Sequence, residues 1–196
     1  MRINKLILLI LLLVSTLSFK EKPIHNKSNK SERMKIEVWS DVVCPFCLIG
    51  KKKLEKAIKS LNAEDKIEIV WRSFQLDPNI PENNSIPSLS YLSERKGYPL
   101  ESIKSMCNQL KENGKEYGVD FKFEQALTFN TSKAHQLIKW ANLYGKSSEV
   151  KEALMIAHFS KGMDLSDPNS ILEVVRSEEH TSELQSPCNL VCRLLL

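Results

Sequence analysis

The sequence predicts an α/β fold in which an all-helical domain is inserted after a first strand–helix–strand unit. Residues 35–40 and 67–74 alternate polar and apolar side chains, as half-buried strands do. Between them, residues 44–62 follow a helical pattern, and from residue 88 onward apolar residues recur at helical spacing. We therefore expect one strand–helix–strand unit that is followed by several helices.

Each element has its own local signal. In the first helix, Leu54, Ile58 and Leu61 share one face, and lysines occupy most of the opposite face. Turn-forming residues predict a loop over residues 77–85, and Gly97, Gly118 and Gly145 mark breaks between the later helices. We expect the aromatic side chains Trp39 and Trp71 to belong to the core.

Cys44-Pro45-Phe46-Cys47 follows the first strand and stands at the start of the first helix. A strand, a Cys-x-x-Cys motif and a helix in this order indicate a thioredoxin-like redox motif. At a helix start, unpaired N–H groups and the helix dipole stabilise a thiolate. We therefore expect Cys44 to be the nucleophile, Cys47 to resolve the mixed disulfide, and the two to form a redox-active disulfide.

The two residues inside the motif are expected to tune its redox balance. Proline has no N–H to lose, and its fixed φ suits the first turn of a helix, where Pro45 stands. Phe46 offers the thiolate no hydrogen bond, so we expect an intermediate redox potential.

Composition argues against two other classes of protein. Structural zinc needs four ligands, but Cys107 stands alone and Cys188 and Cys192 have the wrong spacing, so no metal is expected. The net charge of +4 comes from residues 1–33, which hold seven Lys and Arg against two Glu. The remainder has no basic patch that calls for nucleic acid.

Four separated segments together resemble a known family. They are MKIEVWSDVVCPFCLIG at 34–50, WRSFQLDP at 71–78, NTSKAH at 130–135 and AHFSKGMDL at 157–165. In this order they closely resemble the FrnE-type branch of the DsbA family of thiol–disulfide oxidoreductases. The resemblance implies a thioredoxin-like domain at 34–175, with a first half at 34–80 and a helical insertion at 81–175. It also implies thiol- or disulfide-containing protein or small-molecule substrates, with glutathione as a candidate co-substrate and no bound cofactor.

Two further residues are candidates for the substrate cleft. Asp41 stands three residues before Cys44, where an acid either assists proton transfer or caps a turn. His135 matches the family's Asn-Thr-x-x-Ala-His pattern, which implies a helix of the insertion that faces the cleft. The alternative for His135 is a helix histidine with a structural partner. Cys107 lies at a buried helical spacing and is expected to act as a small hydrophobe.

The N-terminal 33 residues are expected to lie outside the domain. Residues 1–19 have a basic start, a short apolar run and small residues, which is typical of a secretory signal. The alternative is a spurious extension upstream of a true start at Met34. Residues 20–33 read as a disordered linker. The first interpretation predicts export and the second a cytoplasmic protein, and neither predicts stable insertion in a membrane.

The C-terminal 21 residues are expected to be artefactual. The run RSEEHTSELQS at 176–186 is the in-frame translation of a common sequencing-library adapter. The resemblance implies that family members continue past Val175 with a cis-proline loop, two strands and a final helix, and nothing after Val175 resembles these. We therefore expect a chain that lacks the C-terminal strands and the final helix of the fold.

Three functions remain open on the sequence. The first is a disulfide oxidoreductase that acts through Cys44 and Cys47. The second is a glutathione-dependent isomerase of the related 2-hydroxychromene-2-carboxylate type, which the presence of the second cysteine disfavours. The third is an inactive truncated fragment.

Overall fold

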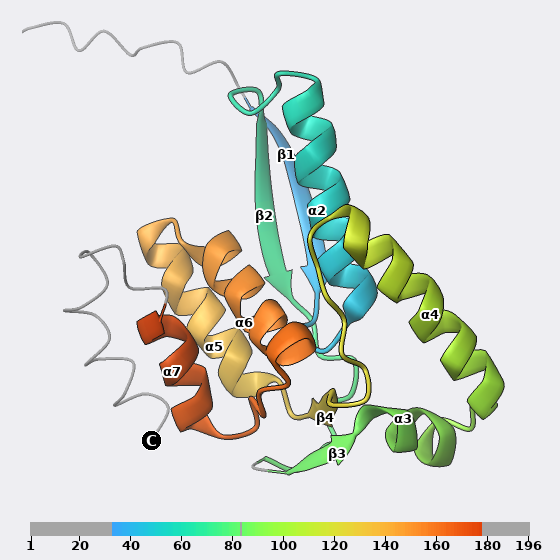
Figure 1. Cartoon of the computed structure of the whole chain (residues 1–196). Coiled ribbons are helices and arrows are strands. Elements are labelled where there is room, and N and C mark those ends of the chain that lie inside the picture. Colours follow the sequence, from blue (N-terminus) through green and yellow to red (C-terminus); the bar gives the residue numbers. More distant parts are fainter. Residues whose placement is uncertain (1–32, 83, 178–196) are drawn as a thin grey trace, which may run out of the picture. The chain divides into compact units, whose positions relative to one another are not determined.

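The computed structural model describes residues 33–82 and 84–177 of this chain (Figure 1). The predictions made for residues 1–32 and 178–196, which include the secretory signal and most of the tail, lie outside the described residues. Within the described ranges, no helix is both long and apolar enough to cross a membrane.

The first strand–helix–strand unit is present as predicted. It consists of β1 (Met34–Ser40), α2 (Pro45–Ser60) and β2 (Ile67–Ser73). The two strands are parallel, in a register that runs from Met34 opposite Ile67 to Ser40 opposite Ser73. α2 is the crossover between them, and Asn62, with a φ of 49°, follows the end of this helix. The carboxyl end of β1 therefore leads directly into the Cys-x-x-Cys motif.

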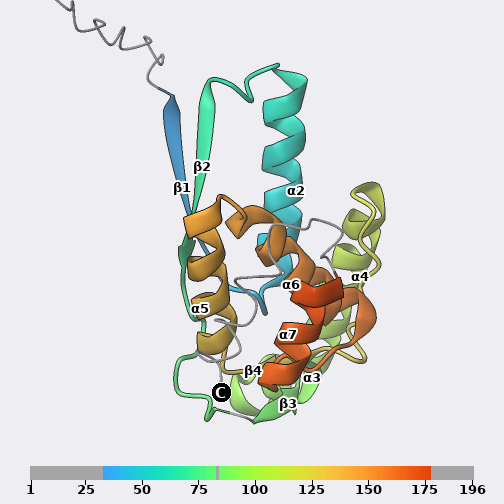
Figure 2. The same cartoon turned by 90° about the vertical axis from the view of Figure 1, so that its left-hand side faces the viewer.

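The remaining part of the chain is mainly helical, which confirms the predicted insertion. Its helices are α3 (Ser88–Ser90), η1 (Tyr91–Arg95), α4 (Leu100–Glu116), α5 (Ser132–Ala141), η2 (Asn142–Tyr144), α6 (Ser147–Lys161) and α7 (Pro168–Ser177). α5 packs against α6 and α6 against α7, while α2 contacts both α4 and α6 (Figure 2). α2 thus lies between two groups of inserted helices.

One feature of the insertion was not predicted. β3 (Ser85–Pro87) and β4 (Leu127–Phe129) form a small antiparallel sheet, with Ser85 opposite Phe129. Strands of three residues are too short for a period of two to be recognised in the sequence. This sheet joins the segment after β2 to the segment before α5, and both border the pocket described below.

The core lies among the helices rather than on the first sheet. Its fully buried side chains include Leu48 of α2, Leu137 of α5 and Leu154 of α6. The expectation that Trp39 belongs to the core is wrong, since this side chain is 60% exposed. Among the described strands β1 pairs only with β2, so the first sheet has two strands. The alternation of polar and apolar residues in β1 predicts a strand, but it does not show whether other elements cover the face that carries Trp39.

His158 gives the fold a specific pH dependence. It is buried on α6 between the rings of Phe129 and Phe159, and burial lowers its pKa to about 4. In the unfolded chain its pKa is about 6.5, so between these values the unfolded chain binds the extra proton. We expect protonation of His158 to lower the free energy of unfolding by about 3 kcal/mol as pH drops from 6.5 to below 4.

Urea unfolding at pH 4.5 and 7.5, with the wild-type chain and His158→Met, measures this effect. Because carboxylates that do not interact with His158 contribute equally to both proteins, the difference between the two pH dependences reports on His158 and its interaction with Asp164. We expect a flatter profile for the variant. Two parallel profiles would show that His158 is protonated as easily in the folded chain as in the unfolded one.

Candidate active site

Cys44 occupies the N-cap position of α2, as the sequence predicts. Its backbone is extended, with φ −100° and ψ 108°, and Pro45 follows it at the first helical position. The carbonyl oxygen of Cys44 accepts the N–H groups of Cys47, at 3.1 Å, and Leu48, at 3.4 Å. The N–H groups of Phe46 and Cys47 also act on the Cys44 sulfur and favour its ionised form. The first turn of α2 therefore directs N–H groups toward this sulfur.

Cys44 and Cys47 form one hydrogen-bonded pair that shares a proton. The hydrogen bond between the thiols raises the pKa of Cys44 far above its usual range and lowers the pKa of Cys47 to about 6. The Ser40 hydroxyl, the Asp41 backbone N–H and the charge of Lys151 lower the Cys47 pKa further. The pair consequently carries one negative charge near neutral pH and resists losing its second proton.

Each sulfur of the pair has its own stabilising groups. The N–H groups of Phe46 and Cys47 favour the charge on Cys44, the position that the helix-start argument gives. Ser40, the Asp41 N–H and the buried Lys151 favour it on Cys47, which lies against the carboxyl end of β1. Of these groups Lys151 is distant in the sequence and could not enter a local argument.

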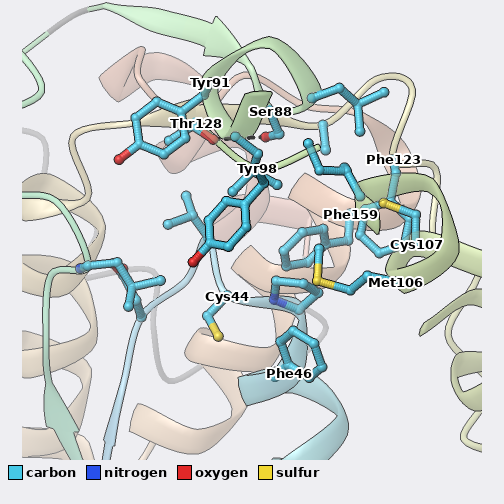
Figure 3. Close-up of a pocket in the computed structure, with 18 of the residues that line it drawn as sticks. Cys44, Phe46, Ser88, Tyr91, Tyr98, Met106, Cys107, Phe123, Thr128 and Phe159 are labelled. Carbon is cyan, nitrogen blue, oxygen red and sulfur yellow. Dashed lines mark hydrogen bonds between the residues drawn. The ribbon is translucent and has the colours of Figure 1, made fainter. Parts of the chain in front are cut away.

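Cys44 also lines a pocket with a volume of about 390 Å³ (Figure 3). α4 contributes Met106 and Cys107 to the wall, and three phenylalanines also line it, namely Phe123, Phe129 and Phe159. Phe46 lies at the same pocket and is 57% exposed. Cys107 is buried there as expected, and burial raises the pKa of its thiol.

Few polar groups line this pocket, and the charged ones are all acidic. The hydroxyl groups of Ser88 and Thr128 are hydrogen bonded to each other at 2.9 Å, and the Tyr91 hydroxyl donates to Asp77 at 2.5 Å. Asp41 supplies the second carboxylate of the lining. No lysine or arginine lines the pocket among the residues that the structure describes. The site therefore suits an apolar group that lies next to the Cys44 sulfur.

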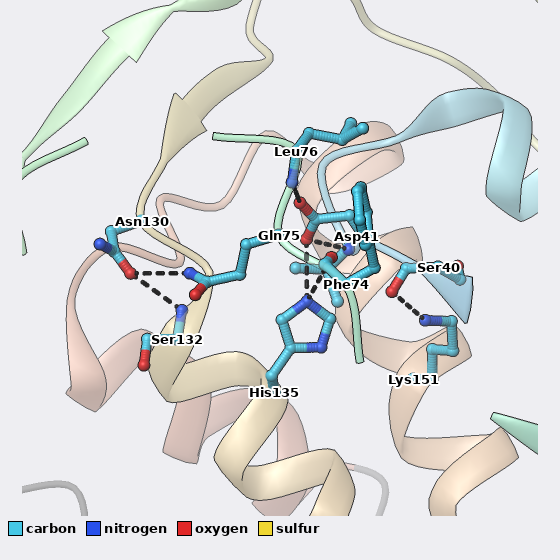
Figure 4. A network of polar contacts seen from close by, with 10 residues as sticks. Ser40, Asp41, Phe74, Gln75, Leu76, Asn130, Ser132, His135 and Lys151 are labelled. Carbon is cyan, nitrogen blue, oxygen red and sulfur yellow. Dashed lines mark hydrogen bonds and ion pairs between the residues drawn. The ribbon is translucent and has the colours of Figure 1, made fainter. Parts of the chain in front are cut away.

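Asp41 is the centre of a buried polar network behind the motif (Figure 4). Its carboxylate accepts the backbone N–H groups of Val42 and Leu76, both at 2.8 Å. The ring Nε2 of His135 lies 3.0 Å from Asp41 Oδ1 and 3.1 Å from the carbonyl oxygen of Phe74. Since both partners are acceptors, we assign the proton of His135 to Nε2.

The structure thus separates the two candidate cleft residues. Asp41 lines the pocket, while His135 is buried behind it and reaches it only through Asp41. The Asp41 carboxylate has the partners that a structural role requires, whereas Nδ1 of His135 is buried without a hydrogen-bond partner among the described residues. The motif around His135 has a further use, because the Asn130 side chain accepts the Ser132 N–H at the start of α5 and the Gln75 amide from the segment after β2.

Lys151 of α6 belongs to the site and was not predicted. It is 1% exposed, donates from Nζ to the Ser40 carbonyl oxygen at 3.5 Å, and lies 5.4 Å from the centre of the Trp71 ring. Burial lowers its pKa to about 8, and Cys47, Asp41 and Cys44 oppose this effect. A signal does exist in the sequence, because Lys151 shares the helical face of Leu154 and His158, where a charge is unexpected.

Comparison with known proteins agrees with this geometry. Residues 35–183 match the family model of the DSBA-like thioredoxin domain. The chain is 29% identical over 136 residues to the uncharacterized protein YwbO of Bacillus subtilis (strain 168), a match that covers 67% of this chain and 60% of YwbO. It is also similar to the crystal structure of the probable DsbA oxidoreductase SCO1869 from Streptomyces coelicolor. That similarity has a TM-score of 0.73 at 25% identity and covers 82% of this chain and 68% of the other.

Proposed function

This chain belongs to the family of DSBA-like thioredoxin domains, and from that premise we propose that it is a thiol–disulfide oxidoreductase that acts through Cys44 and Cys47. One observation carries the proposal. Cys44 stands at a helix start on the wall of a pocket, and Cys47, which does not line that pocket, is hydrogen bonded to it. The four sequence motifs favour the FrnE-type branch.

Access decides which cysteine attacks. Among the lining residues of the described pocket Cys44 is present and Cys47 is not, so a substrate disulfide meets Cys44 first. Transfer of the shared proton from Cys44 to Cys47 leaves a thiolate on Cys44 beside the N–H groups of Phe46 and Cys47. That thiolate attacks one substrate sulfur, the substrate S–S bond breaks, and the second substrate sulfur leaves as a thiolate that takes up a proton.

The second step releases the substrate. Cys47 loses its proton and attacks the Cys44 sulfur of the mixed disulfide, which expels the other substrate thiol. Two electrons have then passed from the cysteine pair to the substrate, and the pair is a disulfide. The same two steps in reverse oxidise a substrate dithiol.

The pocket indicates the substrate class. Its lining is apolar, with two carboxylates and no cationic side chain among the described residues, so a substrate with an apolar group next to its cysteine fits best. Glutathione carries two carboxylates, and the described lining offers no cationic side chain to bind them. That mismatch, together with the complete cysteine pair, argues against the glutathione-dependent isomerase.

Redox equilibration tests the proposed activity. The reduced chain is incubated in glutathione buffers of increasing oxidising power, free thiols are alkylated and the protein is analysed by mass spectrometry. We expect an internal disulfide between Cys44 and Cys47, and the same behaviour in a Cys107→Ser control. A stable glutathione adduct without the internal disulfide would favour the isomerase, and thiols that stay free throughout would favour an inactive fragment.

Substrate preference is tested with two short peptide disulfides that differ in one residue. With leucine beside the cysteine we expect a kcat/KM about tenfold higher than with aspartate, since a favourable apolar contact replaces a repelled charge. A Ser88→Lys variant should reduce this preference, because it adds a cation to the pocket wall. Equal kcat/KM values for the two peptides in the wild-type chain would show that the pocket does not select the substrate.

A further inference from the structure

Two lysines are buried in the described part of the chain, and they differ in their partners. Lys51 of α2 is 3% exposed and forms ion pairs with Glu55, at 2.6 Å, and with Glu152. Lys151 is 1% exposed and has no carboxylate within 4.0 Å among the described residues. A buried ammonium without an anion is costly, because burial removes its hydration. Lys151 therefore needs an anionic partner, and none of the ion pairs in the described part of the chain provides one.

The charged and titratable groups around Lys151 are few. Cys47 and Cys44 come from the motif, Asp41 from the turn before it, and Lys51 from α2. Trp71 of β2 adds a ring face. The Asp41 carboxylate is already bound by two backbone N–H groups and by His135. The thiolate of the cysteine pair is thus the anion that lacks a cation, and Lys151 is the cation that lacks an anion.

We propose that Lys151 is a positioning residue for the exchange reaction, in which its buried ammonium is the counter-ion of the thiolate that the reduced Cys44–Cys47 pair carries. This inference rests on the proposed function. It gives the helical insertion a direct part in the redox chemistry, because α6 carries the lysine and the first strand–helix–strand unit carries the sulfurs.

The effect of Lys151 on the redox potential follows from the loss of the thiolate charge on oxidation. When the pair reduces a substrate disulfide, two electrons and one thiol proton leave it, a second proton comes from solvent, and a neutral S–S bond replaces the thiolate. The ammonium of Lys151 then faces no anionic sulfur. Lys151 therefore stabilises the reduced form relative to the disulfide and makes the disulfide more oxidising than Phe46 alone would predict.

The effect should depend on pH with a definite sign. In the reduced chain the pKa of Lys151 is about 8, and the two sulfurs act to raise it. Below this value the lysine is charged and stabilises the thiolate. As pH rises through about 8 the ammonium loses its proton, and its contribution to the redox potential disappears.

The test is the redox potential of Lys151→Met in glutathione buffers at pH 7, together with the thiolate absorbance at 240 nm as a function of pH. We expect the disulfide to be favoured about tenfold more than in the wild-type chain, which corresponds to a potential about 30 mV more negative. The thiolate titration should move to a pH about one unit higher. At pH 9 the two chains should differ much less.

Two variants separate electrostatics from packing. Lys151→Arg keeps the charge and should retain most of the wild-type potential. If Lys151→Met does not fold, the potential of Lys151→Arg still tests the role of the charge. Lys51→Met removes an equally buried lysine that has carboxylate partners, and it should change the potential far less. A folded Lys151→Met chain with an unchanged potential and titration, or an equal shift in Lys51→Met, would overturn the proposal. The titration needs no turnover, so it is independent of whether the chain proves to be an oxidoreductase.

Discussion

Replacing Cys47 with serine is expected to stop turnover while leaving the first half of the exchange reaction intact. Cys44 still lines the pocket, and a serine hydroxyl at position 47 can donate a hydrogen bond to the Cys44 thiolate. The variant should therefore attack a substrate disulfide and then remain in the mixed disulfide, because no second sulfur is present to resolve it. We expect the rate of insulin reduction to fall by about a thousandfold or more.

Mass spectrometry under non-reducing conditions, after mixing with a peptide disulfide, measures the trapped species. The expected adduct is on Cys44 in Cys47→Ser, and no adduct is expected in Cys44→Ser. Cys107→Ser provides the matched control, because Cys107 lines the same pocket but has a raised thiol pKa. Wild-type turnover in Cys47→Ser would be incompatible with a two-cysteine mechanism.

The parts of the site that the sequence predicts correctly are local. The start of α2 at Cys44 follows from Pro45 and from the change of period between β1 and the helix, all within about one turn. Lys151 could not be assigned in this way. It meets Ser40 from 111 residues away along the chain, and only the packing of α6 against α2 brings it to the motif.

Asp41 illustrates the same limit. The sequence leaves two readings open, a proton-transfer group or a cap of a turn. The structure shows contacts with Val42, Leu76 and a histidine that is 94 residues away. These partners support the structural reading, since the carboxylate holds the turn before the motif, the segment after β2 and the first turn of α5 together.

Asp41→Ala is accordingly expected to lower the free energy of unfolding by about 3–5 kcal/mol. Asp41 is 1% exposed, and its removal leaves the buried N–H of Val42, the half-buried N–H of Leu76 and the His135 ring without this acceptor. Urea unfolding followed by circular dichroism measures the loss. Asp77→Ala is the control, because Asp77 also accepts several hydrogen bonds but lies near the surface, where an ion pair such as that with Lys96 contributes about 1 kcal/mol or less.

Asp41→Asn distinguishes the two readings of this residue. Val42 and His135 use Oδ1 and Leu76 uses Oδ2, so an asparagine can keep one set of contacts and must lose the other. A structural role predicts that stability and kcat/KM fall together, because Leu76 borders the pocket. A variant with nearly wild-type stability and a kcat/KM lower by orders of magnitude, at every pH tested, would instead assign proton transfer to Asp41. The network would then be the device that orients a catalytic acid, and His135 would be expected to show the same loss when replaced by glutamine.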